Sequence, residues 1–111
     1  MIISVEPEEA DCLLVSILSG EPSISKGAQN SIMAGLNCIE VSLAAWPSIK
    51  RGADFFLSIE DRLALEAMTL LAGTGIDSGE SGAAGLAGLL SVCDRFQGQR
   101  VLIINTEGHC T

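Results

Sequence analysis

Apolar side chains recur with helical spacing near the middle of the chain. Leu63, Ala67 and Leu70 stand at positions i, i+4 and i+7, and charged and polar residues fill the opposite side. This period of about 3.6 residues predicts an amphipathic helix over residues 60–72. Residues 58–61, Ser-Ile-Glu-Asp, have the pattern of a capping box at its start.

A second helix is predicted near the amino terminus. Its apolar face consists of Leu13, Leu14, Ile17 and Leu18. Pro7 and the acidic residues after it suit a first helical turn, because proline fits there and negative charge complements the helix dipole. Gly20 and Pro22 then end the helix.

The remaining pattern alternates strands with helices. Strands are predicted over residues 2–5, 55–59 and 101–105, and further helices over residues 42–51 and 83–95. The last strand, Val-Leu-Ile-Ile-Asn, is almost continuously apolar, which is typical of a strand buried on both faces. This order predicts an α/β fold with a mainly parallel sheet covered by helices.

A glycine-rich stretch lies between two of the predicted helices. Residues 78–82, Ser-Gly-Glu-Ser-Gly, form a polar loop, and residues 83–90 contain only Ala, Gly and Leu. Glycine is about 1 kcal/mol less favourable than alanine in a helix, so Gly85 and Gly88 indicate close packing. Free backbone N–H groups at the helix start would suit an anionic ligand.

The composition of the chain excludes some classes of function. The 111 residues make at most one domain, and 48% of them are hydrophobic while 18% are charged. Such an apolar composition is easier to explain in a part of a larger protein than in an independently folded domain. The net charge of −8 argues against nucleic-acid binding, and no apolar run approaches the roughly 20 residues of a membrane span.

The four cysteines show neither a CxxC motif nor a nearby histidine pair. We therefore expect Cys12, Cys38, Cys93 and Cys110 to be reduced and mostly buried, without a zinc site. With no basic, apolar leader at the start of the chain, the expected location is the cytoplasm.

Several blocks of residues resemble one family. They are residues 3–13 (ISVEPEEADCL), 31–38 (SIMAGLNC), 46–47 (WP), 78–86 (SGESGAAGL) and 104–108 (INTEG). In this order they are similar to the C-terminal part of the diaminopropionate ammonia-lyase family. These enzymes use pyridoxal 5'-phosphate (PLP) and share the tryptophan-synthase-β type with threonine dehydratase and serine racemase.

The resemblance implies a fold and a reaction. Residues 1–111 would be the C-terminal portion of a single PLP-dependent domain, with three helix–sheet–helix layers and a mainly parallel sheet. The parent reaction would be the α,β-elimination of ammonia from 2,3-diaminopropionate, a step of amino-acid metabolism that yields pyruvate and a second ammonia.

The resemblance also implies cofactor-binding residues. The hydroxyl of Thr106 would hydrogen-bond the pyridine nitrogen of PLP, a neutral contact that makes a weaker electron sink than a carboxylate would. Backbone at Gly35 and Leu36 would lie near the ring edge, and Glu80, Ser81 and Gly82 would line the pocket.

Other parts of the family's site are missing from this chain. The Schiff-base lysine and the phosphate-binding loop lie upstream in the family, and we expect Lys26 and Lys50 to be surface residues. The chain alone is therefore predicted to have no catalytic residue and no activity.

Serine racemase-like relatives also bind a divalent cation. Glu6 and Ala10 match two of its ligands, but Cys12 replaces the third, an aspartate. A hard cation disfavours a thiolate, so no metal site is expected here.

Three functions stay open at this point. The chain is a fragment of the lyase, or a non-catalytic subunit that complements a separate polypeptide carrying the lysine, or a small α/β module that binds an anionic metabolite at residues 78–82. The expected partners are an amino-acid substrate of the parent enzyme and either the missing N-terminal half or a second copy of the chain.

Overall fold

Two parallel strands form the centre of the computed structural model, which describes residues 1–108. Strand β1 (Ile3–Pro7) pairs with β2 (Phe55–Ile59) in a register that sets Ile3 opposite Phe55 and Pro7 opposite Ile59. Parallel strands need a long crossover, and the chain between them supplies one.

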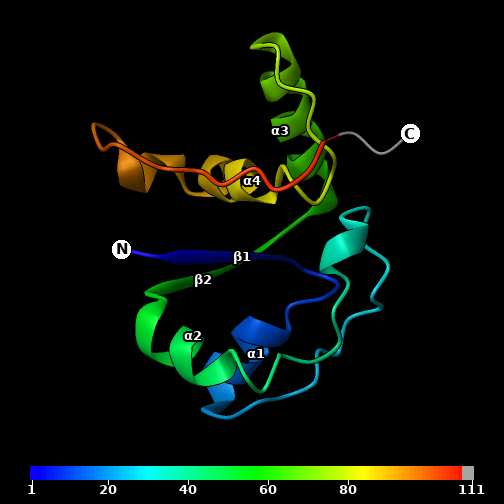
Figure 1. Cartoon of the computed structure of the whole chain (residues 1–111), viewed down its shortest axis with the longest axis vertical. Coiled ribbons are helices and arrows are strands. Elements are labelled where there is room, and N and C mark those ends of the chain that lie inside the picture. The colour runs from blue at the N-terminus through cyan, green and yellow to red at the C-terminus, as the bar shows by residue number, and fades with distance from the viewer. Residues whose placement is uncertain (109–111) are drawn as a thin grey trace.

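The helices lie on both faces of this pair. The helices are α1 (Cys12–Ser19), α2 (Trp46–Gly52), α3 (Asp61–Gly73) and α4 (Ala84–Ser91), with short 3₁₀ turns η1 (Ala34–Leu36) and η2 (Cys93–Phe96). Figure 1 shows α3 and α4 on one side of the strands, with α1 and α2 on the other. The predicted α/β fold of three layers with a parallel sheet is confirmed.

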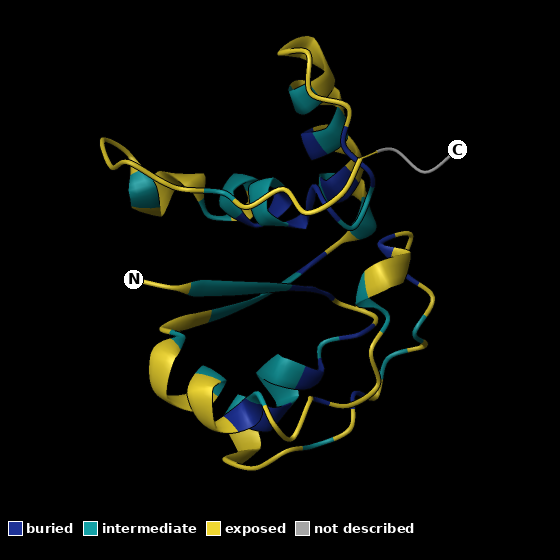
Figure 2. Cartoon of the chain, in the orientation of Figure 1, coloured by how far each residue is buried: buried dark blue, intermediate teal, exposed yellow. Residues whose placement is uncertain are grey.

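The main core lies where α3 and α4 meet the strands (Figure 2). Its buried residues are Met33, Ile59, Ala64, Ala67, Ala83, Ala84 and Ala87. Because five of these seven are alanines, the helix backbones approach closely. Gly88 shows how closely, since a Cβ built on it would lie 2.5 Å from Cγ2 of Val5. The expected packing role of Gly88 is confirmed.

Several predicted boundaries are wrong. Pro7 ends β1 instead of opening a helix, and α1 begins at Cys12. Gly20 does end that helix, with a left-handed φ of 85°. The helix predicted over residues 83–95 divides into α4 and η2, with Val92 between them.

The capping box predicted over residues 58–61 does not form. Strand β2 continues through Ile59, so Ser58 lies in the strand and Glu60 is the N-cap of α3 instead. Among residues 1–108, no side chain caps that helix.

The predicted strand over residues 101–105 is the largest correction. The segment is neither a strand nor buried on both faces, and Leu102 and Ile104 are 88% and 72% exposed. Ile103 is half-buried and touches α4, where its Cγ2 lies 3.1 Å from a Cβ built on Gly85. Within residues 1–108 this apolar segment has no strand beside it.

The expectation of mostly buried cysteines is also wrong for the described part of the chain. Cys12 is buried, whereas Cys38 and Cys93 are exposed, and all three are free thiols. Cys110 lies outside the described residues. Among residues 1–108, no helix is long and apolar enough to cross a membrane.

Candidate functional site

Three segments far apart in the sequence meet beside the start of α4. They are residues 34–36, 78–82 and 105–108, which we call the three-segment cluster. The N–H of Gly35 donates a hydrogen bond of 3.0 Å to Oγ of Ser81, which joins the first segment to the second. A Cβ on Gly35 would lie 3.2 Å from the same oxygen, so glycine permits this close approach.

The second and third segments are joined by backbone contacts. Ser78 and Gly108 form an antiparallel bridge, and the N–H of Gly79 donates to the carbonyl of Glu107 at 3.3 Å. A Cβ on Gly82 would lie 2.6 Å from Oδ1 of Asn105. The glycines of residues 78–82 therefore allow the backbones of the second and third segments to touch.

Ser78 and Asn105 form a contact that the sequence did not predict. The buried Ser78 hydroxyl donates to Oδ1 of Asn105 at 3.2 Å. This bond fixes the residue directly before Thr106. No sequence pattern marks the pair, because the two residues are 27 positions apart.

The first segment is held in place by Asp61, at the start of α3. One carboxylate oxygen of Asp61 accepts a hydrogen bond from the Ser31 hydroxyl, and the other accepts from the N–H of Ile32 at 3.1 Å. Asn37 closes the same loop, since its Oδ1 accepts from Ser31 N–H at 3.0 Å. These bonds hold the loop that carries Gly35.

The predicted site residues differ in their exposure and in the hydrogen-bonding groups that they leave free. Thr106 is exposed, and its hydroxyl has no hydrogen-bond partner among residues 1–108. The hydroxyl of Ser81 accepts from Gly35 and keeps its own hydrogen free to donate. Glu80 is half-buried, and Gly82 is buried. Leu36 is half-buried, and its side chain packs against the main core.

The chemistry of the cluster suits a neutral ring better than a phosphate. Its three segments contain two acids, Glu80 and Glu107, and no basic residue. The N–H groups of Ala83 and Ala84, expected to be free at the helix start, donate to Gly79 and Ser81 within the turn. The cluster therefore offers neutral hydroxyl donors and little attraction for a dianion. Hydroxyl donors and close glycine backbone fit the pyridine end of PLP.

Neither lysine is part of this cluster. Lys50 lies on α2, and its Nζ donates to the carbonyl of Gly20 at 3.0 Å on the exposed surface. Lys26 is also exposed, in the loop after α1. The expectation that both are surface residues is confirmed.

Glu6 is buried at the end of β1, where the related cation site would have its glutamate. Its two carboxylate oxygens accept hydrogen bonds of 3.0 Å from the N–H groups of Leu13 and Leu14. They thus stabilise the start of α1, where the helix dipole is positive. Burial raises the pKa of Glu6, although these two hydrogen bonds act in the opposite direction.

Cys12 lies beside Glu6, and its thiol does not favour the binding of a metal ion. Its Sγ lies 3.6 Å from Oε2 of Glu6, and burial together with the charge of Glu6 raises the pKa of the thiol to about 11. A protonated thiol is a poor ligand for a hard cation. Within residues 1–108, no group of three His, Cys, Asp or Glu residues could hold a metal ion.

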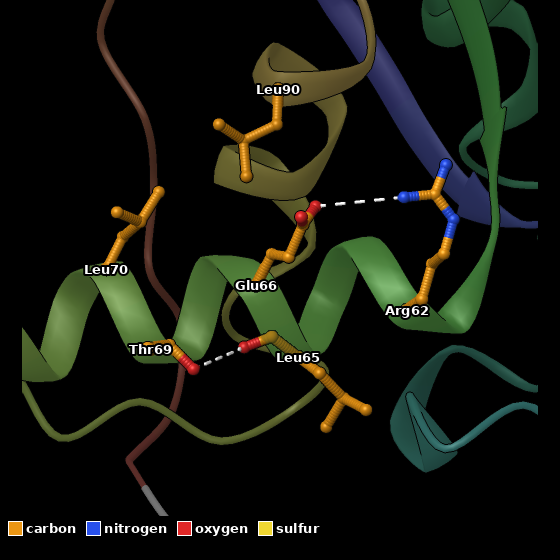
Figure 3. A pocket seen from close by; sticks show the side chains of 6 residues that line it. All are labelled: Arg62, Leu65, Glu66, Thr69, Leu70 and Leu90. Atoms are coloured by element: carbon orange, nitrogen blue, oxygen red, sulfur yellow. Dashed lines mark hydrogen bonds and ion pairs between the residues drawn. The ribbon is translucent and has the colours of Figure 1, made fainter.

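A separate groove of about 430 Å³ lies between α3 and α4. Figure 3 shows Leu90 of α4 facing Glu66 and Leu70 of α3 across it. Arg62, Leu65 and Thr69 complete its lining, and none of the predicted cofactor residues contributes to it. The groove is therefore distinct from the three-segment cluster.

Comparisons with known proteins agree with this architecture. Residues 1–107 match the family described as pyridoxal-phosphate dependent enzyme. The diaminopropionate ammonia-lyase of Salmonella typhimurium strain LT2 is 35% identical over 96% of this chain, and that of Escherichia coli K12 is 36% identical over 96%. The chain spans 31% of the length of either relative.

Solved structures show the same fold. A serine racemase from Dictyostelium discoideum superimposes with a TM-score of 0.85 and 28% identity, over 98% of this chain and 35% of that one. A threonine deaminase from T.th. gives a TM-score of 0.86 over all of this chain and 38% of that one, and at 22% identity shows the fold alone. The resemblance to the diaminopropionate ammonia-lyases is thus confirmed, and the chain belongs to the pyridoxal-phosphate dependent enzyme family.

Proposed function

We propose that this chain is the C-terminal portion of a PLP-dependent ammonia-lyase domain and forms one wall of its cofactor pocket. The observation that carries the proposal is the convergence of residues 34–36, 78–82 and 105–108. These are the segments to which the family resemblance assigns the cofactor, and two of them are joined by a hydrogen bond that spans 46 positions.

Each residue has a distinct part in this proposal. The free hydroxyl of Thr106 donates to the pyridine nitrogen, and the buried Ser78 holds Asn105 beside it. Ser81 is fixed by Gly35 and lines the pocket together with Glu80 and Gly82. The bound cofactor supplies the electron sink that lowers the barrier to loss of the α-proton and the β-amino group.

The substrate proposed for the complete enzyme is 2,3-diaminopropionate, with pyruvate and ammonia as products. The relatives from Salmonella typhimurium and Escherichia coli carry the name of this reaction. The chain alone is expected to be inactive with added PLP, because both of its lysines lie outside the cluster.

A chimeric enzyme tests the proposal. The matched third of the Salmonella typhimurium enzyme is replaced by this chain, and the purified chimera is assayed for bound PLP by absorbance and for pyruvate release from 2,3-diaminopropionate. We expect both. A folded chimera that neither binds PLP nor releases pyruvate would show the proposal to be wrong.

Thr106 is tested in the same chimera. Loss of its hydroxyl in Thr106→Ala removes a neutral hydrogen bond worth about 0.5–1.5 kcal/mol, so turnover is expected to fall about two- to tenfold. Thr106→Ser keeps the hydroxyl and should retain most of the activity. Thr69→Ala is the matched control, because Thr69 is exposed on α3 and, among residues 1–108, its hydroxyl binds the carbonyl of Leu65 alone.

A further inference from the structure

Asp61 lies outside the three-segment cluster, yet hydrogen bonds connect it to that cluster. It is the first residue of α3, where the helix dipole favours a negative charge. Its two carboxylate oxygens accept from the Ser31 hydroxyl and from the N–H of Ile32. Because α3 contributes to the main core, these bonds attach the loop before η1 to a rigid part of the molecule.

Ser31 connects Asp61 to the turn η1. While its hydroxyl donates to Asp61, the same oxygen accepts from the N–H of Met33 at 3.0 Å. Met33 is fully buried, and its carbonyl accepts from the N–H of Leu36 at 2.9 Å. The side-chain amide of Asn37 bonds both the N–H and the carbonyl of Ser31, each at 3.0 Å. The loop is therefore held at both of its ends.

Gly35 is the residue through which this loop meets Ser81. Its N–H donates to Oγ of Ser81 at 3.0 Å and is the one partner of that hydroxyl among residues 1–108. A serine side chain otherwise rotates among three staggered positions. An N–H held against one lone pair fixes the oxygen and leaves the hydroxyl hydrogen to donate elsewhere. The position of the loop therefore determines where Ser81 can donate.

We propose that Asp61 is a positioning residue for the cofactor, which acts through the loop and Gly35 to orient the Ser81 hydroxyl as a second donor to PLP. The inference rests on the proposed function, which assigns Ser81 to the pocket wall. The three-segment cluster has no basic residue, so correctly directed hydroxyls are the side-chain donors that it offers to PLP. Asp61 contributes from outside the pocket, because its carboxylate bonds the loop and not the wall.

A double-mutant cycle distinguishes positioning from a purely structural role. If Asp61 acts through Ser81, its removal affects PLP binding only while the Ser81 hydroxyl is present. If Asp61 only stabilises the fold, its removal has the same effect with or without that hydroxyl.

The cycle is measured in the chimera that carries this chain in place of the matched third of the Salmonella typhimurium enzyme. The dissociation constant of PLP is obtained by absorbance titration. Ser81→Ala removes a neutral hydrogen bond and should weaken PLP binding about two- to tenfold. Asp61→Ala should weaken it by a similar factor in the original chimera and by no further factor in the Ser81→Ala background.

Three other variants provide rescue, a control and a second route. Asp61→Asn keeps an acceptor for the N–H of Ile32 and can donate to Oγ of Ser31, so it should restore most of the PLP affinity. Glu66→Ala removes an exposed carboxylate from the same helix and should leave the affinity unchanged. Ser31→Ala interrupts the same connection without altering α3, and it replaces Asp61→Ala in the cycle if circular dichroism shows that Asp61→Ala does not fold.

The chain alone gives a measurement that requires no cofactor. Amide exchange of Gly35, followed by NMR, should be at least about tenfold faster in Asp61→Ala than in the original chain, because its N–H loses the fixed contact with Ser81. Asp61→Asn should restore slow exchange.

The outcomes distinguish this inference from the proposed function. A chimera that binds PLP but loses the same affinity to Asp61→Ala with and without the Ser81 hydroxyl overturns the positioning role and leaves the proposed function standing. Unchanged exchange of Gly35 in a folded Asp61→Ala chain also overturns it. An original chimera that folds without binding PLP contradicts the proposed function, and the positioning role falls with it.

Discussion

Val5 of β1 occupies the space that a side chain on Gly88 would need. A Cβ built on Gly88 would lie 2.5 Å from Cγ2 and 3.0 Å from Cγ1 of Val5. Valine in a strand is stiff at χ1, so it cannot easily move aside. This contact limits how closely α4 approaches β1.

Gly88→Ala is therefore expected to destabilise the chain although alanine is the better helix former. Overpacking of this kind costs about 1–3 kcal/mol of unfolding free energy. Urea unfolding followed by circular dichroism measures it. The control is Gly73→Ala at the end of α3, where a Cβ meets nothing within 4 Å in the described part of the chain, and there we expect no loss. Equal stability of the two variants would contradict the role of the Val5 contact.

The elements predicted best from sequence are those whose signal is local. Strand β2 has the predicted bounds, and α3 begins and ends within a residue of the predicted helix over residues 60–72. The spacing of apolar residues along a helix identifies that helix regardless of which element packs against it. The start of α1 was missed because its N–H groups are capped by Glu6, which comes from the preceding strand.

The segment 101–105 was predicted wrongly for a different reason. An apolar run shows that burial is favourable, but it does not show which surface provides the burial. Leu102 and Ile104 find no such surface within residues 1–108. The apolar run alone therefore predicts a strand, but an extended segment forms a β-strand only where another strand pairs with it.

The site was predictable as three blocks but not as an arrangement. The family resemblance assigned Gly35, Ser81 and Thr106 to one pocket, and their segments do lie together. The residues that hold them there, Ser78 and Asp61, act over 27 to 30 positions of sequence and have no motif.

Asp61→Ala is expected to release the loop that carries Gly35. The variant removes a carboxylate that accepts hydrogen bonds from Ser31 and Ile32, so the free energy of unfolding should fall by about 1–3 kcal/mol. Hydrogen exchange of residues 31–37 should rise more than that of α1. Glu66→Ala on the same helix is the control, because its contact with Arg62 is 3.9 Å long and exposed, and such pairs contribute about 0–1 kcal/mol. A loop equally protected in both variants would rule out this role of Asp61.

The described cysteines are expected to differ in reactivity. Cys38 and Cys93 are exposed, whereas Cys12 is 3% exposed and its pKa is raised to about 11 by burial and by the charge of Glu6. Iodoacetamide at pH 8 should therefore label Cys38 and Cys93 in the folded chain and Cys12 only after unfolding. Peptide mass spectrometry after a short labelling pulse, with and without urea, gives the comparison. Rapid labelling of Cys12 in the folded chain would show that α1 opens readily.

Glu6 should make stability depend on pH in an unusual direction for a carboxylate. Because burial raises its pKa above 4.5, the folded chain holds the Glu6 proton more tightly than the unfolded chain does. Its stabilising contribution is full below about pH 4.5 and is lost as the pH rises through the folded value. In Glu6→Gln the group is neutral at every pH, and one acceptor oxygen remains for the start of α1.

The free energy of unfolding of the original chain minus that of Glu6→Gln should therefore fall between pH 4 and pH 7. Urea unfolding at intervals across this range measures the difference, and Glu8→Gln, a change at an exposed neighbour, serves as the control. A difference that rises with pH would mean that the N–H groups of Leu13 and Leu14 stabilise the carboxylate by more than burial opposes it. The hydrogen bonds between Glu6 of β1 and the start of α1 would then depend on the ionised form of Glu6.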